Sequence, residues 1–192
     1  MILPIIENRW SPRAFSSREV SPQQVKTLLK AASMAPSAFN DQPWAFLVGF
    51  KGDGSWNTIF DTLADGNKVW AESAPVLLMA MGRKHWLRDK TATNPTWKYD
   101  LGQSVAFLTL QASEMGLWVH QMGGFDHGKA IQSISIPISW EPVVAIAVGY
   151  LGDAGQLPPD LAALEKGPKK RKEFSNFVFF EKFGVSDNRF EE

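Results

Sequence analysis

Apolar residues recur three or four positions apart in the segment that follows Ser21. This spacing places them on one side of a helix and predicts a single buried stripe. Ser21 is a typical N-cap residue, and Pro22 suits the first helical position because its missing N–H would have no partner there. We therefore predict a helix that begins at Pro22 and ends before Pro36. Its buried positions would be Val25, Leu28, Leu29 and Ala32.

Three short runs are apolar almost without interruption, at residues 45–50, 75–82 and 142–150. Their length and the prolines and glycines beside them are typical of strands. A strand with one face in solvent would alternate apolar and polar residues, and these runs do not alternate. The pattern therefore predicts a sheet that is covered by helices on both faces.

A longer helix is predicted between the second and third of these runs. Asn94 and Pro95 would open it, and Gly116 would follow its last residue, where glycine is common. The apolar residues of this segment fall on more than one side of the helix, which predicts that it is buried nearly all round. They are Leu101, Val105, Phe107, Leu108, Leu110, Ala112 and Met115.

The segment FSNFVFFEKFG, residues 174–184, is the most aromatic part of the chain, with five phenylalanines. It follows a turn-rich and then basic region, far in sequence from the other predicted strands. A late aromatic strand of this kind often pairs with the sheet edge of a second copy. We therefore predict a homodimer in which the terminal arms are exchanged.

Composition narrows the possible functions. The 192 residues carry a formal net charge of zero, so no overall field would draw the chain to nucleic acid or to a membrane. No cysteine is present, so any redox chemistry would need a bound cofactor. No apolar stretch reaches the roughly 20 residues of a spanning helix, and the first residues lack a basic, cleavable leader. We expect one domain over residues 1–192 in a soluble, cytoplasmic protein.

The sequence contains no glycine-rich phosphate loop, because neither a Walker A motif nor a G-x-G-x-x-G between a strand and a helix is present. A bound phosphate would have to be held by cationic side chains, and Arg9, Arg13 and residues 169–172 are the clustered candidates. The three histidines, His85, His120 and His127, lack metal-site spacing, so we predict no metal and expect them to be surface or loop residues.

Several segments resemble, in the same order along the chain, the motifs of the flavin-dependent nitroreductase family. RWSPRAF at residues 9–15 is similar to the family's arginine, serine and second basic residue. PSAFNDQPW at residues 36–44 is similar to its Pro-Ser, Asn and Gln-Pro-Trp segment. Further matching segments are GNKVWAESAPVLLM (66–79), GLWVHQMGGFDHGKAIQSISIP (116–137), PVVAIAVGYLG (142–152) and KKRKEFSNFVF (169–179).

The resemblance implies an α+β fold in which helices flank a central, mostly antiparallel sheet. It also implies an obligate homodimer with an FMN at each of two subunit interfaces. Members of the family take a hydride from NADH or NADPH and release the nicotinamide. They then reduce a small-molecule acceptor such as a nitroaromatic or a quinone, in a ping-pong order. The sequence leaves the choice of acceptor and of nicotinamide donor open.

The resemblance assigns the cations to different parts of the cofactor. Arg9 would contact the FMN phosphate, and Ser11 would make a neighbouring polar contact. Arg13 would lie near N1 and O2 of the flavin, where a fixed positive charge favours the reduced form, so it is the candidate catalytic residue. Lys169 and Arg171 would complete the phosphate site. The alternatives from the residues alone are a surface ion pair for Arg9 and a solvated or nucleic-acid-binding face for the closing basic run.

Pro36, Ser37 and Asn40 correspond to the segment that reaches the flavin from the partner subunit. Proline, serine and asparagine also favour turns, so the same residues are explained by a turn that ends the preceding helix. Both interpretations can hold at once.

Asn67 corresponds to a family asparagine that hydrogen-bonds the pyrimidine edge of the flavin, where an amide offers both a donor and an acceptor. Gly123 and Gly124 correspond to the segment that passes close to flavin N5, and a plain tight turn is the alternative. One departure is Trp70, which stands where a branch of the family has a lysine. Substrate choice would depend on loops around the ring, including residues 82–96 with Trp86.

A different class of function is compatible with the same residues. The chain would then be a dimeric flavin-binding module that stores, carries or senses FMN without efficient turnover. The two hypotheses differ in whether NADH or NADPH reduces the bound flavin quickly.

Overall fold

The sheet of this computed structural model, which describes residues 1–187 and 189, has four strands in the order β1-β2-β4-β3. These are β1 (Trp44–Phe50), β2 (Val76–Arg83), β3 (Trp118–Met122) and β4 (Trp140–Gly149), and all neighbours are antiparallel. The three predicted strands are confirmed to within two residues at each end. β3 lies inside one of the family-like segments and had no strand prediction of its own.

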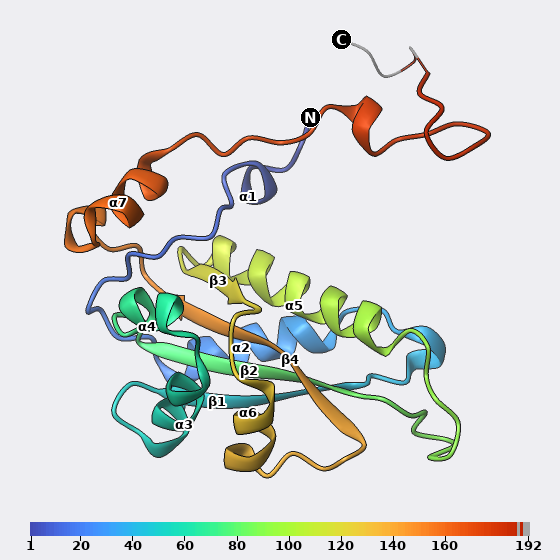
Figure 1. The fold of residues 1–192 in the computed structure, drawn as a ribbon, viewed down its shortest axis with the longest axis horizontal. Coiled ribbons are helices and arrows are strands. Elements are labelled where there is room, and N and C mark those ends of the chain that lie inside the picture. Colours follow the sequence, from blue (N-terminus) through green and yellow to red (C-terminus); the bar gives the residue numbers. More distant parts are fainter. Residues whose placement is uncertain (188, 190–192) are drawn as a thin grey trace.

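Helices cover both faces of the sheet, as the uninterrupted apolar runs predict (Figure 1). On one face lie α2 (Pro22–Ser33) and α5 (Trp97–Glu114), which pack against Val76, Leu78 and Ala80. On the other face lie three short helices, which pack against the alternate residues Leu77 and Met79. They are α3 (Gly54–Thr62), α4 (Asp65–Ala71) and α6 (His127–Ile134).

Helix α2 begins as predicted. The Oγ atom of Ser21 accepts a hydrogen bond from the Gln24 N–H at 3.2 Å, and the Gln24 side chain accepts one from the Ser21 N–H at 2.9 Å. This capping box satisfies two backbone donors that a helix start otherwise leaves free. The Gln24 amide also donates to the Tyr150 hydroxyl at 2.9 Å, so the cap fixes the helix against the end of β4.

Helix α5 differs from the prediction in two respects. It begins at Trp97, because the buried Asn94 side chain accepts hydrogen bonds from the N–H and hydroxyl of Thr96 and so closes a turn before the helix. It is also not buried all round in the single chain, since Tyr99 is 71% and Phe107 40% exposed. The helix forms an outer layer, so only one side faces the sheet and α2. Gly116, with φ +69°, follows the helix end as predicted.

The remaining elements are short. They are α1 (Pro4–Glu7), α7 (Pro159–Lys166) and the 3-10 turns η1 (Ala38–Asn40), η2 (Ala154–Gln156) and η3 (Phe174–Asn176). None of the helices in the described part of the chain combines the length and apolar character needed to cross a membrane.

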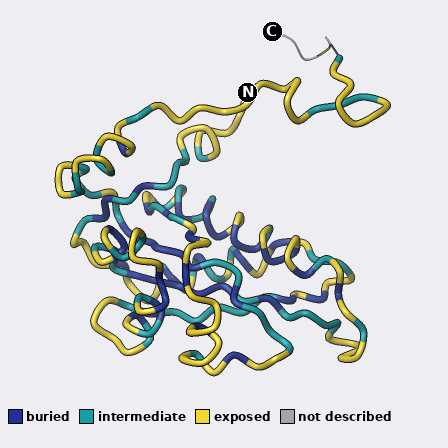
Figure 2. The backbone as a smooth tube through the Cα atoms, in the orientation of Figure 1, coloured by how far each residue is buried: buried dark blue, intermediate teal, exposed yellow. Residues whose placement is uncertain are grey.

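Beyond α7 the chain forms an extended arm that runs past α1 and away from the body (Figures 1 and 2). Most of this arm is exposed. The predicted aromatic strand is not formed in the described chain, because residues 174–184 contain η3 and turns instead of a strand. No strand of the chain's own sheet pairs with this segment. Exchange of the arm with a second copy stays a prediction.

Candidate functional site

The segment from Arg9 to Arg13 is fixed through its backbone. One carboxylate oxygen of Glu165, on α7, accepts hydrogen bonds from the N–H groups of Arg13 at 2.8 Å and Ala14 at 3.1 Å. On the other side, the Nδ1 atom of His120 on β3 lies 2.9 Å from the Pro12 carbonyl oxygen and donates to it. The segment is therefore held between α7 and β3, with its two arginine side chains free of this backbone clamp.

Cations from the far end of the sequence join this segment. The Lys169 ammonium lies 4.2 Å from the centre of the Trp10 ring and donates to the Glu165 carbonyl at 2.7 Å. Burial of the Arg9 guanidinium lowers its pKa, and the positive charge of the nearby Arg171 lowers this pKa further. Arg9 also donates a long hydrogen bond, 3.4 Å, to the Ser11 hydroxyl. The segment from Arg9 to Arg13 and the basic residues after α7 therefore lie in one region of the structure. This region contains the predicted residues Arg9, Ser11, Arg13, Lys169 and Arg171.

These cations lack acidic partners. Within the described residues no carboxylate forms an ion pair with Arg9, Arg13 or Arg171. The partly buried Arg9 and the exposed Arg171 repel each other, and an anion would stabilise both. A phosphate offers oxygens that match the guanidinium fork. The observed charges therefore fit an anionic group.

Asn67 and Gly124 lie together near this segment. The Asn67 amide donates to the Gly124 carbonyl at 2.9 Å. Trp70, one turn further along α4, packs on His120 with 4.4 Å between ring centres, and His120 holds Pro12. A Cβ atom on Gly124 would lie 2.9 Å from the Asn67 amide nitrogen, so a side chain there would disturb this pair. At Gly123 a Cβ would meet nothing within 4 Å, so only Gly124 requires the small residue.

The 36–42 turn lies at the end of α5 opposite to the segment that follows α1 (Figure 1). This turn contains Pro36, Ser37 and Asn40. The N–H of Ala38 donates to the Asp100 carboxylate in the first turn of α5, whereas Arg9 lines the same small hollow as Ser113 at the end of that helix. Asp100 and Ser113 are thirteen residues apart, or about 20 Å along the helix. One copy of the chain therefore does not bring these two groups of predicted residues together.

The turn interpretation of residues 36–42 is confirmed. The Ser37 hydroxyl accepts from the Gln42 N–H at 3.0 Å, and Gln42 also donates to the Asn40 side chain. Phe39, Asn40 and Gln42 have φ values of 53°, 55° and 46°. Non-glycine residues rarely adopt this left-handed conformation, and such strain concentrates at functional sites.

Three polar residues near these groups carried no prediction of a site role. The buried Asp41 accepts hydrogen bonds from Arg83, Leu87 and Asn94 and fixes the 36–42 turn. Glu165 is only 6% exposed, and its second carboxylate oxygen accepts no hydrogen bond from the described residues. The sequence feature that could have identified Glu165 is its position as a charged residue on the apolar side of a short helix. His120 was expected to be a surface or loop residue, but it lies on β3 between Trp70 and Pro12.

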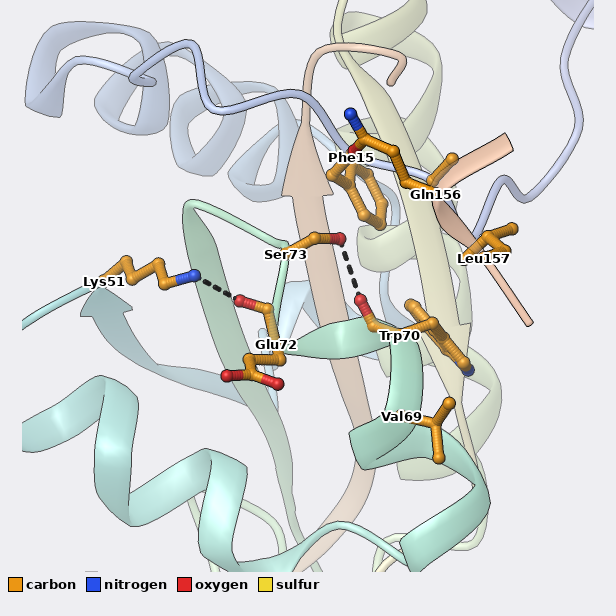
Figure 3. Close-up of a pocket in the computed structure, with 9 residues that line it drawn as sticks. Phe15, Lys51, Val69, Trp70, Glu72, Ser73, Gln156 and Leu157 are labelled. Carbon is orange, nitrogen blue, oxygen red and sulfur yellow. Dashed lines mark hydrogen bonds between the residues drawn. The ribbon is translucent and has the colours of Figure 1, made fainter. Parts of the chain in front are cut away.

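The hollows in the single chain do not coincide with the predicted site. One of about 250 Å³ lies behind Phe15 and Trp70, with the Ser73 hydroxyl donating to the Trp70 carbonyl at its wall (Figure 3). A second, of about 920 Å³, adjoins it at the start of α2. A third, of about 190 Å³, contains Arg9. None of these three unites the predicted residues, so the cationic site is open on the surface of one chain.

His120 gives the fold a pH dependence. Burial lowers the pKa of the imidazole below the usual 6.5, and the positive charge of Arg13 lowers it further, against the opposing hydrogen bond to Pro12. The unfolded chain then binds more protons than the folded one just below pH 6.5, so stability rises with pH through that range. His120 should contribute its full stabilisation above this pH and lose it as the pH falls.

We expect the free energy of unfolding, measured by denaturant titration, to fall between about pH 7.5 and about pH 5.5. His120→Gln should remove part of that slope. His127→Gln is the matched control, because His127 is exposed and packs only on Phe125 in the described chain. An identical slope in the wild type and His120→Gln would show that this histidine does not titrate differently in the folded state.

The fold and the cluster of cations together define the class of the protein, an α+β protein with an antiparallel sheet and basic residues from both ends of the chain in one region. The model of the nitroreductase family matches residues 6–54. A solved structure described as an oxidoreductase containing FMN is 33% identical, with a TM-score of 0.91 over 97% of this chain and 94% of that one. The chain belongs to the nitroreductase family, as its motifs predict.

Two more distant structures share the fold. A nitroreductase family protein from Clostridium difficile 630 is 22% identical, with a TM-score of 0.74 over 95% of this chain and 99% of that one. An FMN and NADPH-dependent nitroreductase from Sphigopyxis sp. strain HMH is 15% identical, with a TM-score of 0.71 over 93% and 98%. The predicted fold class is thereby confirmed.

Proposed function

We propose that this chain is an FMN-dependent oxidoreductase that oxidises NADH or NADPH and reduces a nitroaromatic, a quinone or a similar electron-poor acceptor. The observation that carries the proposal is the cluster of cations from both ends of the chain that form no ion pair with the described carboxylates. The family membership and the FMN named for the relative at 33% identity support it. The NADPH named for a structural neighbour supports a nicotinamide donor.

In this proposal Arg9, Lys169 and Arg171 bind the phosphate of FMN, and Ser11 adds a polar contact. A phosphate between Arg9 and Arg171 would replace their repulsion by two attractive pairs, because each guanidinium can donate two parallel hydrogen bonds. Lys169 is already oriented by the Trp10 ring and the Glu165 carbonyl. These residues therefore need little rearrangement to accept the anion.

Arg13 and Asn67 are proposed to face the flavin ring. When bound, FMN supplies the chemistry of the reaction, accepting two electrons and a proton from the nicotinamide and passing them to the acceptor. The guanidinium of Arg13 would stabilise the negative charge that reduction places on the pyrimidine end of the ring. The Asn67 amide, oriented by Gly124, would bind the same edge, and the open space at Gly123 would admit the ring.

The proposed enzyme is a homodimer. Pro36, Ser37 and Asn40 cannot reach the cations of their own chain, so we propose that they complete the site of the second copy. The exposed Tyr99 and Phe107 of α5 and the extended arm are surfaces that a second copy would bury. Oxidised nicotinamide would leave before the acceptor enters, in a ping-pong order. We place the enzyme in the cytoplasm, where both nicotinamide donors are present.

The test is to reconstitute the purified protein with FMN, remove unbound flavin and add NADH or NADPH without oxygen. A yellow protein that bleaches quickly and regains colour with an acceptor is the expected result. Protein that stays colourless after reconstitution would contradict the proposal. Full flavin occupancy with slow bleaching by both donors would instead favour a module that stores or senses FMN.

A further inference from the structure

A rigid hairpin follows strand β2 at residues 84–94. Its arms are joined by hydrogen bonds from the Trp86 N–H to the Ala92 carbonyl, 3.2 Å, and from the Asn94 N–H to the Lys84 carbonyl, 2.9 Å. At its tip the Asp89 carboxylate accepts from the N–H and hydroxyl of Thr91. The hairpin therefore has a defined shape.

Asp41 joins this hairpin to the 36–42 turn. Its carboxylate, whose side chain is 5% exposed, accepts from the Leu87 N–H at 2.8 Å and from the Arg83 guanidinium at 3.0 Å. Arg83 donates in turn to the His85 carbonyl at 2.7 Å. A buried, hydrogen-bonded ion pair holds its partners in one geometry, because separating them would leave a charge unpaired. The turn and the hairpin thus keep a fixed relative position.

On the outer side of this junction lie Phe39, Trp86 and Arg88, which we call the aromatic–arginine surface. The two rings meet edge to face with 5.6 Å between their centres. The Arg88 guanidinium lies 4.4 Å from the centre of the Phe39 ring and 5.3 Å from that of Trp86. Within the described residues Arg88 forms no close ion pair. Hydrogen bonds from Thr91 lower the pKa of the adjacent Asp89 carboxyl group, and the positive charge of Arg88 helps to lower it further.

Phe39 combines an unfavourable backbone conformation with an exposed side chain. It is 76% exposed and has a left-handed φ of 53°, a conformation that residues other than glycine rarely adopt. In a single chain the Phe39 side chain buries too little surface to offset the strain of its backbone. The strained backbone and exposed ring of Phe39, beside a guanidinium that forms no close ion pair in the described chain, therefore point to a contact with something outside the chain.

We propose that the aromatic–arginine surface binds the acceptor and selects planar aromatic compounds that carry a carboxylate. The inference rests on the proposed function, in which residues 36–40 reach the flavin site of the other copy. The guanidinium would form paired hydrogen bonds with the carboxylate, and the two rings would pack on the aromatic ring of the acceptor. A guanidinium that lies beside two rings and forms no close ion pair in the described chain matches one anionic group on one flat ring.

The experiment compares 4-nitrobenzoate with its uncharged counterpart 4-nitrobenzamide as acceptors of the FMN-loaded enzyme with NADH. In Arg88→Gln, kcat/KM for 4-nitrobenzoate divided by kcat/KM for 4-nitrobenzamide should fall about tenfold, as expected for loss of one charge-assisted pair. The dissociation constant of 4-nitrobenzoate from the oxidised holoenzyme, measured by calorimetry, should rise by a similar factor.

Two variants control for charge and for stacking. Lys90→Gln removes the same charge from the same hairpin, and Arg18→Gln removes a guanidinium that lies 3.8 Å over the Tyr150 ring elsewhere. Both should leave the ratio unchanged. An unchanged ratio in an Arg88→Gln enzyme that stays yellow and reducible by NADH would overturn the inference. A wild type without flavin or without bleaching would instead contradict the proposed function.

Discussion

Arg13→Ala should slow reduction of the bound flavin by NADH or NADPH about 100-fold, as is typical when one positioned group that stabilises developing charge is removed. The backbone of Arg13 is fixed by Glu165, so its guanidinium projects from a rigid segment. No carboxylate in the described chain neutralises that guanidinium. Its charge is therefore available to the reduced cofactor. The rate is measured by anaerobic stopped-flow absorbance.

The same variant should lower the reduction potential of the flavin. A tenfold change in a two-electron equilibrium corresponds to about 30 mV, so a shift of at least that size is expected in a dye-equilibration titration. Arg13→Lys keeps the charge and should recover part of both quantities. If Arg13→Ala and Arg9→Ala changed the rate and the potential equally, the division of roles between the two arginines would be wrong.

Arg9→Ala should mainly weaken FMN binding, raising the dissociation constant by about 100-fold for the loss of a bidentate, charge-assisted contact. Burial and Arg171 already lower the pKa of Arg9, so the positive charge is held there at a cost that a phosphate would offset. The constant is measured by quenching of flavin fluorescence as apoprotein is added.

The matched control for this prediction is Arg18→Ala, because Arg18 packs on Tyr150 and lies outside the cationic cluster. FMN affinity should be unchanged in that variant. Binding to Arg9→Ala should also be less sensitive to salt than binding to the wild type, since one phosphate contact is lost. Wild-type affinity in Arg9→Ala would mean that other residues hold the phosphate.

Local sequence patterns were sufficient for much of the fold. The uninterrupted apolar run at residues 75–82 predicts a strand covered on both faces, and alternate residues of β2 do enter two separate cores. The start of α2 follows from Ser21 and Gln24, which need only each other to cap the helix. These features depend on neighbours close in sequence, so a single sequence reveals them.

Other features depend on which surfaces meet. The apolar residues on the outer side of α5 look the same in sequence whether they pack on the chain's own sheet or on a second copy. Phe107 is 40% exposed in the single chain, so the prediction of a helix buried all round is wrong for this chain alone. The aromatic arm has the same ambiguity. The contact between Arg13 and Glu165 spans 152 positions, and only the tertiary fold brings these residues together.

The candidate site also combines features that the sequence shows with features that only the structure shows. The sequence motifs identify Arg9, Asn40 and Arg171 without showing how far apart they lie. The structure places Arg9 close to Arg171 and leaves the turn that contains Asn40 at the other end of α5. No spacing rule within one sequence could have shown that separation, because it follows from the length and direction of α5.

A mixed dimer provides the most direct test of a site shared between two copies. One copy would carry Arg9→Ala with Arg171→Ala, the other Ser37→Ala with Asn40→Ala, and the pair would be isolated through two different tags. A shared site predicts one tightly bound FMN per mixed dimer, because the intact cations of one copy face the intact turn of the other. If each site lay within a single chain, both sites of the mixed dimer would be damaged. A mixed dimer without tightly bound FMN, alongside fully loaded wild type, would contradict the account.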